Sequence, residues 1–182
     1  LESGTILDPM SPKRKVIGID IDIREHNLEK LEQHPFRNTM ILIEGSSLDK
    51  KIIEKVKNEV KGKKNVLVAL DSNHTHDHVL GELNAYAQLV TKGSYCIVFD
   101  TVIEDLPNEL SSDRPWGKGN NPKTAVHEFL EKNNIGLATK DKSSANCFDN
   151  ALILKLTTFS LPAPKKIKSP VCASQASKIP WI

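Results

Sequence analysis

The sequence predicts an α/β domain with a mainly parallel sheet and helices on both of its faces. Short, nearly continuous apolar runs alternate at least three times with longer segments whose apolar residues recur at helical spacing. Each apolar run also ends in polar or acidic residues. Strands that are buried on both faces and joined by helical crossovers have this pattern, so a parallel sheet is expected.

The expected elements follow one another in order along the chain. The first strand is expected at residues 16–22, and the helix after it, 25–34, ends before Pro35. The other expected strands are 40–43, 65–70, 94–98 and 150–156, and the other expected helices are 49–60, 78–90 and 125–132. The polar stretch between Thr101 and Pro122 is longer than an ordinary connection, and such loops are commonly functional or disordered.

The 182-residue length suits one domain. We expect a residual N-terminal segment at 1–15, the α/β domain at 16–158 and a disordered basic tail at 159–182. The net charge of +2 arises near the C-terminus, because residues 155–182 hold five lysines and no acid, which leaves −3 on the rest. An acidic body offers no electrostatic footprint for nucleic acid.

Composition also limits the compartment and the partners. No apolar run reaches the ~18 residues that a membrane-spanning helix needs, so no transmembrane segment is expected. The three cysteines are widely spaced and form no CxxC motif, which favours a reducing cytoplasm over a zinc cage or a disulfide framework. The oligomeric state stays open, and a homo-oligomer is compatible with the sequence.

Acidic residues follow four of the expected strands. They are Asp20 with Asp22, then Glu44, Asp71 and Asp100. In an open α/β sheet, ligands bind beyond the carboxyl ends of the strands. We therefore expect these acids, although distant in sequence, to gather along one edge of the sheet.

The first two strand ends suit a nucleoside. The carboxylate of Asp20, with Asp22 beside it, can accept hydrogen bonds from both hydroxyls of a ribose. Ser46 and Ser47 follow the next strand, where a hydroxyl can donate to an adenine nitrogen. Ser47 as the N-cap of the helix that begins near Asp49 is an equal alternative.

Asp71 and Asp100 form a candidate metal site. Two carboxylates at neighbouring strand ends make a hard oxygen site that suits Mg²⁺. Such an ion can align and acidify a substrate hydroxyl for attack on a methyl group, with Asp71 thereby part of the catalytic machinery. Helix capping is the structural alternative for both acids.

Three histidines follow Asp71 within a few residues. His74, His76 and His78 stand in an HxHDH pattern, one residue short of the HxHxDH motif of zinc hydrolases, a motif that belongs to an antiparallel sandwich. His74 is the best placed to face the pocket, as a base or a substrate contact, so a zinc trio is the less favoured interpretation.

Four blocks of the chain are similar to one known family. They are GIDIDIREHN, LIEGSSLD, VLVALDSNHTHDHVLGELNAYAQLVTKGSYCIVFDT and RPWGKGNNPKTAVHEFL. In this order, over roughly residues 16–135, they resemble the cephalosporin hydroxylase family. The resemblance implies a Rossmann-like class I methyltransferase fold that uses S-adenosylmethionine and Mg²⁺ to methylate hydroxyls of small molecules or sugars.

The resemblance implies roles for particular residues. Asp20 would be the ribose acid, and Asp71 and Asp100 would be metal ligands. The family has Glu where this chain has Phe99, so one carboxylate is lost, and Glu104 or Asp105 is a candidate substitute. The family's first strand and the glycine-rich turn before GIDID have no counterpart in 1–15, and we expect them to lie upstream.

These observations lead to one main function and two alternatives. An O-methyltransferase would use Asp71, Asp100 and Mg²⁺ to position the acceptor hydroxyl, with His74 helping to remove its proton. The loop with Arg114, Trp116 and Lys118 would close over the substrate. The alternatives are a catalytically impaired remnant of such a domain and a zinc-dependent hydrolase that uses the three histidines.

Overall fold

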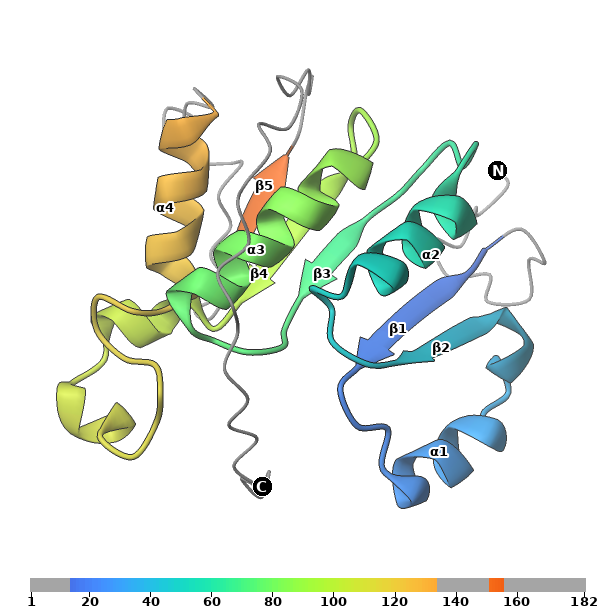
Figure 1. Cartoon of the computed structure of the whole chain (residues 1–182), viewed down its shortest axis with the longest axis horizontal. Helices are drawn as coiled ribbons and strands as arrows, with labels where there is room; N and C mark the ends of the chain where they lie inside the picture. The colour runs from blue at the N-terminus through green and yellow to red at the C-terminus, as the bar shows by residue number, and fades with distance from the viewer. Residues whose placement is uncertain (1–13, 134–150, 156–182) are drawn as a thin grey trace, which may run out of the picture.

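The computed structural model describes residues 14–133 and 151–155, and its elements alternate as the sequence predicts (Figure 1). The strands are β1 Val16–Asp20, β2 Met40–Glu44, β3 Val68–Leu70, β4 Tyr95–Phe99 and β5 Ala151–Lys155. The α-helices are α1 Glu25–Glu32, α2 Lys50–Val60, α3 His76–Tyr86 and α4 Pro122–Lys132. Short 3-10 turns cover Arg37–Thr39, Ala87–Leu89, Thr101–Asp105 and Asn108–Ser111. The α/β class is confirmed, whereas the segment expected at 1–15 and the tail at 159–182 lie almost wholly outside the described residues.

The described strands form two hydrogen-bonded groups. Strands β1 and β2 pair in parallel, with Asp20 opposite Glu44 at their carboxyl ends. Strand β3 pairs in parallel with β4, which also pairs with β5 in the antiparallel sense. Within the described part of the chain, β1 and β3 belong to separate ladders. Figure 1 shows the arrowheads of β1 and β3 pointing the same way, so the acids that follow these strands leave at the same edge.

The core lies mainly on the β3–β4–β5 side. Helix α3 packs against α4, and both contact β3 or β4. The least exposed side chains include Leu83, Cys96, Val98, Val126 and Phe129, each at 1% exposure or less. Burial raises the pKa of the Cys96 thiol to about 12, so this group packs as an apolar side chain. Helix α1, by contrast, contributes no buried residue.

Two helices begin at other residues than expected, because a capping side chain fixes the first residue of each. Helix α4 begins at Pro122 rather than 125, because the Asn121 side chain accepts from the backbone N–H groups of residues 123 and 124 and proline fits the first turn. Helix α2 begins after Asp49, whose side chain accepts from the N–H of Lys51. Ser47 as the cap of α2, one of the two readings left open, is therefore wrong.

Candidate functional site

Asp71, His74 and Asp100 come together at the carboxyl ends of β3 and β4. His74 Nε2 lies 3.0 Å from Asp100 Oδ2 and 3.5 Å from Asp71 Oδ1. One nitrogen and one oxygen from each carboxylate all lie within 4.8 Å of one another, a spacing that suits a metal ion. The His74 side chain is 12% exposed, whereas those of Asp71 and Asp100 are 60% and 39% exposed. The site is thus open to solvent on its acidic side.

The strand register brings the two acids together. Leu70 of β3 lies opposite Val98 of β4 in a parallel pair, so the residues that follow them emerge side by side. Asp100 then adopts a left-handed backbone with φ 55° and ψ 28°. A non-glycine residue costs roughly 1–2 kcal/mol in this region, although Asp tolerates it better than most. The conformation ends β4 sharply and starts the 3-10 turn Thr101–Asp105.

A loop that reaches Trp116 covers one side of His74. The two rings meet edge to face, with their centroids 5.0 Å apart and their planes at 87°. The Arg114 guanidinium carbon lies 5.7 Å from the centre of the Trp116 ring, within the range of a cation–π contact. Lys118 is exposed further along the same loop. The structure therefore brings Trp116 to His74, which the sequence alone did not predict.

Glu104, expected only as a candidate substitute for the lost carboxylate, and Asn121, which was not predicted, hold that loop in shape. Glu104 Oε2 accepts from the N–H of Gly119 at 2.7 Å and from the Asn121 amide at 2.5 Å. These bonds, led by that from Gly119, hold the pKa of Glu104 below its usual value. Asn121 is fully buried and also donates to the carbonyl of Gly117. The Asn-Pro pair at 121–122, typical of a helix start, was the signal available in the sequence.

Among the described residues, no further carboxylate joins Asp71 and Asp100 in place of the Glu that the family resemblance leads us to expect at position 99. Phe99 ends β4 and is 36% exposed. Glu104 is engaged by Gly119 and Asn121, and Asp105 forms an ion pair with Lys123 at 2.6 Å. Neither is in the Asp71–His74–Asp100 group. The idea that one of them substitutes for the lost acid is therefore not supported.

Asp20 and Asp22 lie together at the end of β1. Asp20 is exposed, its Oδ1 accepts from the N–H of Asp22 at 3.1 Å, and its carbonyl accepts from Gly45 at 2.7 Å. The second Asp20 oxygen is not used in that bond. Gly45 has φ 135°, a conformation that favours glycine and lets the chain turn sharply after β2. The turn places Ser46 close to the carboxyl end of β1.

The two serines after β2 have different surroundings. Ser46 Oγ accepts weakly from the N–H of Leu48 at 3.3 Å. Ser47 turns toward α3, where its Oγ lies 3.2 Å from His78 Nε2 and its carbonyl accepts from the Tyr86 hydroxyl at 2.5 Å. Burial, with the charge of Glu82 as a smaller cause, raises the pKa of Tyr86 to about 12, so this hydroxyl stays a donor. Ser47 links β2 to α3, and Ser46 is the freer of the two.

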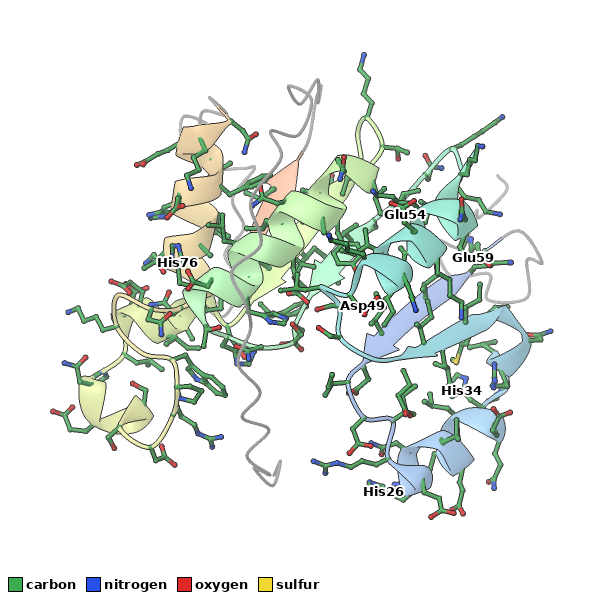
Figure 2. All side chains as sticks on the ribbon, in the orientation of Figure 1. His26, His34, Asp49, Glu54, Glu59 and His76 are labelled. Atoms are coloured by element: carbon green, nitrogen blue, oxygen red, sulfur yellow. The ribbon has the colours of Figure 1, made fainter. Side chains whose placement is uncertain are left out.

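The three histidines point to three different sets of partners. His76 lies beside α4 (Figure 2), with its ring nitrogens 2.8 Å from Thr124 Oγ1 and 3.0 Å from Glu128 Oε2. His78 contacts Ser47 and Glu82. Among the described residues, these histidines form no shared metal-ligand group. The zinc-hydrolase alternative is therefore not favoured by the geometry.

Glu82 is a buried acid that the sequence pattern did not predict as a site residue. It is 2% exposed, and its Oε1 accepts from the Ser72 hydroxyl at 2.7 Å. Burial raises its pKa, but hydrogen bonds from His78, Ser47 and Ser72 outweigh that effect, so the pKa lies below the usual value. The signal in the sequence was a charged residue inside the apolar stripe Val79–Leu83–Tyr86 of α3.

Comparisons with known proteins agree with the sequence blocks. A family model described as rhamnosyl O-methyltransferase/CmcI matches residues 1–152. Rhamnosyl O-methyltransferases of Mycobacterium tuberculosis (strain ATCC 25618 / H37Rv) and Mycobacterium bovis (strain BCG / Pasteur 1173P2) are 37% identical to the chain over 71 residues. That segment covers 37% of this chain and 28% of each relative, so the match spans less than a third of their length.

A solved structure is also similar, more distantly. It is the MycE methyltransferase from the mycinamycin biosynthetic pathway in complex with Mg and SAH, with a TM-score of 0.47 and 14% sequence identity. The alignment covers 76% of this chain and 36% of that one. Separately, none of the helices in the described residues is long and apolar enough to cross a membrane.

Proposed function

Because the chain belongs to the rhamnosyl O-methyltransferase/CmcI family, we propose that it is the cofactor- and metal-holding part of an O-methyltransferase. The methyl donor would be S-adenosylmethionine, and the acceptor a hydroxyl of a small molecule or a sugar. The observation that carries the proposal is the group formed by Asp71, His74 and Asp100, whose donor atoms lie within 4.8 Å of one another. The name of the mycobacterial relatives supports a sugar as the acceptor.

Asp71 and Asp100 would hold a divalent cation such as Mg²⁺. Their carboxylates are hard oxygen donors, and their exposure leaves room for the water or hydroxyl ligands that Mg²⁺ retains. When bound, the ion lowers the pKa of a coordinated hydroxyl and fixes its orientation. Phe99 leaves this ligand set one carboxylate short of the family pattern, so we expect weak metal binding.

His74 would act as the general base. Its Nε2 faces both carboxylates, and thus the position of a hydroxyl held between them. His74 takes the hydroxyl proton as the oxygen forms a bond to the methyl carbon, and the pair of the broken S–C bond stays on sulfur. Asp100, 3.0 Å away, stabilises the resulting imidazolium. Trp116 limits the movement of the ring through its edge-to-face contact.

Asp20 would bind the ribose of the cofactor. It lies exposed at the end of β1, and a carboxylate matches two neighbouring hydroxyl donors. Asp22 adds negative charge and a backbone N–H that orients Asp20. Ser46 is placed to meet the adenine, whereas we assign Ser47 to the contact between β2 and α3.

The loop that carries Arg114, Trp116 and Lys118 would cover the acceptor. Trp116 offers an apolar surface beside the base, and the two cations suit an acceptor with oxygen-rich groups. Glu104 and Asn121 give the loop a fixed base from which its outer part can move. Closure of such a loop excludes water from the methyl transfer.

Substitution of Asp71, with Asp77 as the control, tests the metal site. We expect Asp71→Ala to abolish metal-dependent methyl transfer and to weaken Mn²⁺ or Mg²⁺ binding by titration calorimetry. Asp77→Ala, which removes an exposed carboxylate from the first turn of α3, should leave both unchanged. Equal losses in the two variants would contradict the assignment of Asp71.

Phe99 favours one alternative, a folded domain that has lost catalysis. Titration with S-adenosylhomocysteine separates the two functions. Binding that is weakened at least tenfold by Asp20→Ala supports the methyltransferase. A protein whose circular dichroism and thermal melting are those of a folded domain, but which binds neither S-adenosylhomocysteine nor a divalent ion, would instead be the remnant.

A further inference from the structure

Glu82 is the centre of a polar cluster that the proposed chemistry does not use. The cluster consists of Ser47, Ser72, His78 and Glu82. Ser72 donates to Glu82 Oε1 at 2.7 Å, and His78 Nε2 lies 3.5 Å from the same oxygen and 3.2 Å from Ser47 Oγ. Ser72 and His78 thus both contact Oε1, and the Ser47 hydroxyl is a further hydrogen-bonding neighbour of this carboxylate.

The other oxygen, Glu82 Oε2, is buried and has no hydrogen-bond donor among the residues that the structure describes. The residue as a whole is 2% exposed. A buried carboxylate oxygen without a donor is unfavourable, because it has given up its hydration and gained nothing in return. Ser72 and His78, which contact the other oxygen, are only partly buried, so the cluster lies close to the surface of the described structure. A buried polar group without a partner calls for an explanation, and a ligand that supplies a donor is one.

Two members of the cluster are close in sequence to the two ends of the proposed site. Ser72 directly follows Asp71, at the end proposed for the metal and the methyl group. Ser47 stands three residues after Glu44, the register partner of Asp20, at the end proposed for the nucleoside. A cofactor that extends from Asp20 toward Asp71 would therefore pass near the cluster that contains Glu82.

We propose that Glu82 Oε2 accepts a hydrogen bond from the α-ammonium group of the methionyl part of S-adenosylmethionine. This inference rests on the proposed function. The cofactor has three kinds of N–H or O–H donor, and the ribose hydroxyls and the adenine amino group are matched by Asp20 and the turn at Ser46. The ammonium remains, and it is the donor that a buried carboxylate binds most strongly. Glu82 is then a binding residue for the charged end of the cofactor.

Ligands with and without the amino acid group provide the test. S-adenosylhomocysteine carries the ammonium, its des-amino analogue lacks only that group, and 5′-methylthioadenosine lacks the whole amino acid end. In titration calorimetry of the full chain, we expect Glu82→Gln to weaken S-adenosylhomocysteine about 10- to 100-fold. The affinities for the other two ligands should change less than about threefold, because neither presents an ammonium group to the site.

Glu128→Gln is the matched control. It also removes a helix carboxylate that accepts from a histidine, here His76, but on the α4 side. It should leave all three affinities unchanged. If Glu82→Gln does not fold, the unaltered chain still tests the proposal, since it should bind the des-amino analogue about 10- to 100-fold more weakly than S-adenosylhomocysteine.

The outcomes separate this inference from the proposed function. If the unaltered chain binds S-adenosylhomocysteine and its des-amino analogue equally well, or if Glu82→Gln weakens all three ligands alike, Glu82 has a structural role and the inference is wrong, while the proposed function stands. If the unaltered chain binds neither S-adenosylhomocysteine nor 5′-methylthioadenosine, the proposed function fails and this inference fails with it.

Discussion

The backbone of Asp100 shows how one residue shapes the proposed metal site. Its left-handed conformation ends β4 and turns the chain into the 3-10 turn that follows. Its carboxylate lies 3.0 Å from His74 Nε2. A residue in a sparsely populated conformation persists where its surroundings fix it, and such residues cluster at functional sites. The conformation and the carboxylate at this position thus serve the same site.

Phe99, the neighbour of Asp100, allows a direct test of the metal site. We expect Phe99→Glu to tighten Mn²⁺ or Mg²⁺ binding at least about tenfold, because it adds a third carboxylate beside Asp71 and Asp100. The measurement is titration calorimetry. Tyr95→Glu is the control, since Tyr95 is a similarly exposed aromatic residue at the opposite end of β4. An unchanged affinity for Phe99→Glu would remove position 99 from the metal site.

At the scale of single residues, the sequence predicts which side chains meet at the carboxyl ends of paired strands. The approach of Asp71 to Asp100 follows from parallel pairing, and it was predicted without a structure. Glu82 was missed because its importance depends on burial. An acid in an amphipathic helix usually faces solvent, and only the packing of α3 shows that this one faces inward.

Among the elements, the connection between β4 and α4 joins the fold to the proposed site. The 3-10 turn Thr101–Asp105 packs against α4, and Glu104 from that turn binds the loop that precedes the helix. Asn121 both caps α4 and fixes this loop. A change in the cap should therefore also shift Trp116, which the same loop places against His74.

The stability of this connection should depend on pH through Glu104. Its pKa is held below the usual 4.5, so its contribution to stability is complete above that pH and is lost as the pH falls through the lower folded-state pKa. We expect Glu104→Gln to lower the melting temperature near neutral pH, and the difference from the unaltered chain to shrink below about pH 4. Glu109→Gln, an exposed acid in the next 3-10 turn, is the control. A difference that is constant from pH 7 to pH 3 would contradict this role.

The elements themselves were predicted more reliably than their limits. Periodicity depends on many residues and therefore identified α2, α3 and α4. The first residue of a helix depends on one capping side chain, and in α4 the cap at Asn121 moves the start by a full turn. The two 3-10 turns after β4 have too few residues for periodicity to reveal them.

Across the whole molecule, the buried residues are unevenly distributed. Most of them belong to α3, β4 and α4, whereas β1 contributes none and β2 contributes Ile43. Strands β1 and β2 form a two-stranded ladder, and α1 beside them has no buried residue. A two-stranded ladder is marginal unless other elements pack on it. The β1–β2 side is therefore the less stable side of the described structure.

Hydrogen exchange provides a measurement of this difference. We expect the amides of β1 and β2 to exchange at least about tenfold faster than those of β4 under native conditions, because local opening exposes little apolar surface there. The measurement is exchange followed by mass spectrometry or NMR. Amides of α3 and α4 serve as the protected reference. Equal protection of β1 and β4 would mean that the two sides unfold as one unit.

The overall architecture was predicted because alternation and strand-end acids extend over most of the chain. The separation of β1 from β3 was not predictable from periodicity, which identifies strands but does not say which of them pair. Strand order depends on contacts between residues far apart in the chain.

The two separate ladders have a practical consequence. Within the described structure, β1 and β3 each have one strand partner, and apolar Val16 and Leu67 beside these edges are 61% and 54% exposed. Unpaired backbone N–H and C=O groups beside exposed apolar side chains can pair with an extended segment of another chain. We therefore expect this chain to aggregate at lower protein concentration, measured by turbidity, than a protein whose sheet edges are covered. Val16→Lys should delay the aggregation.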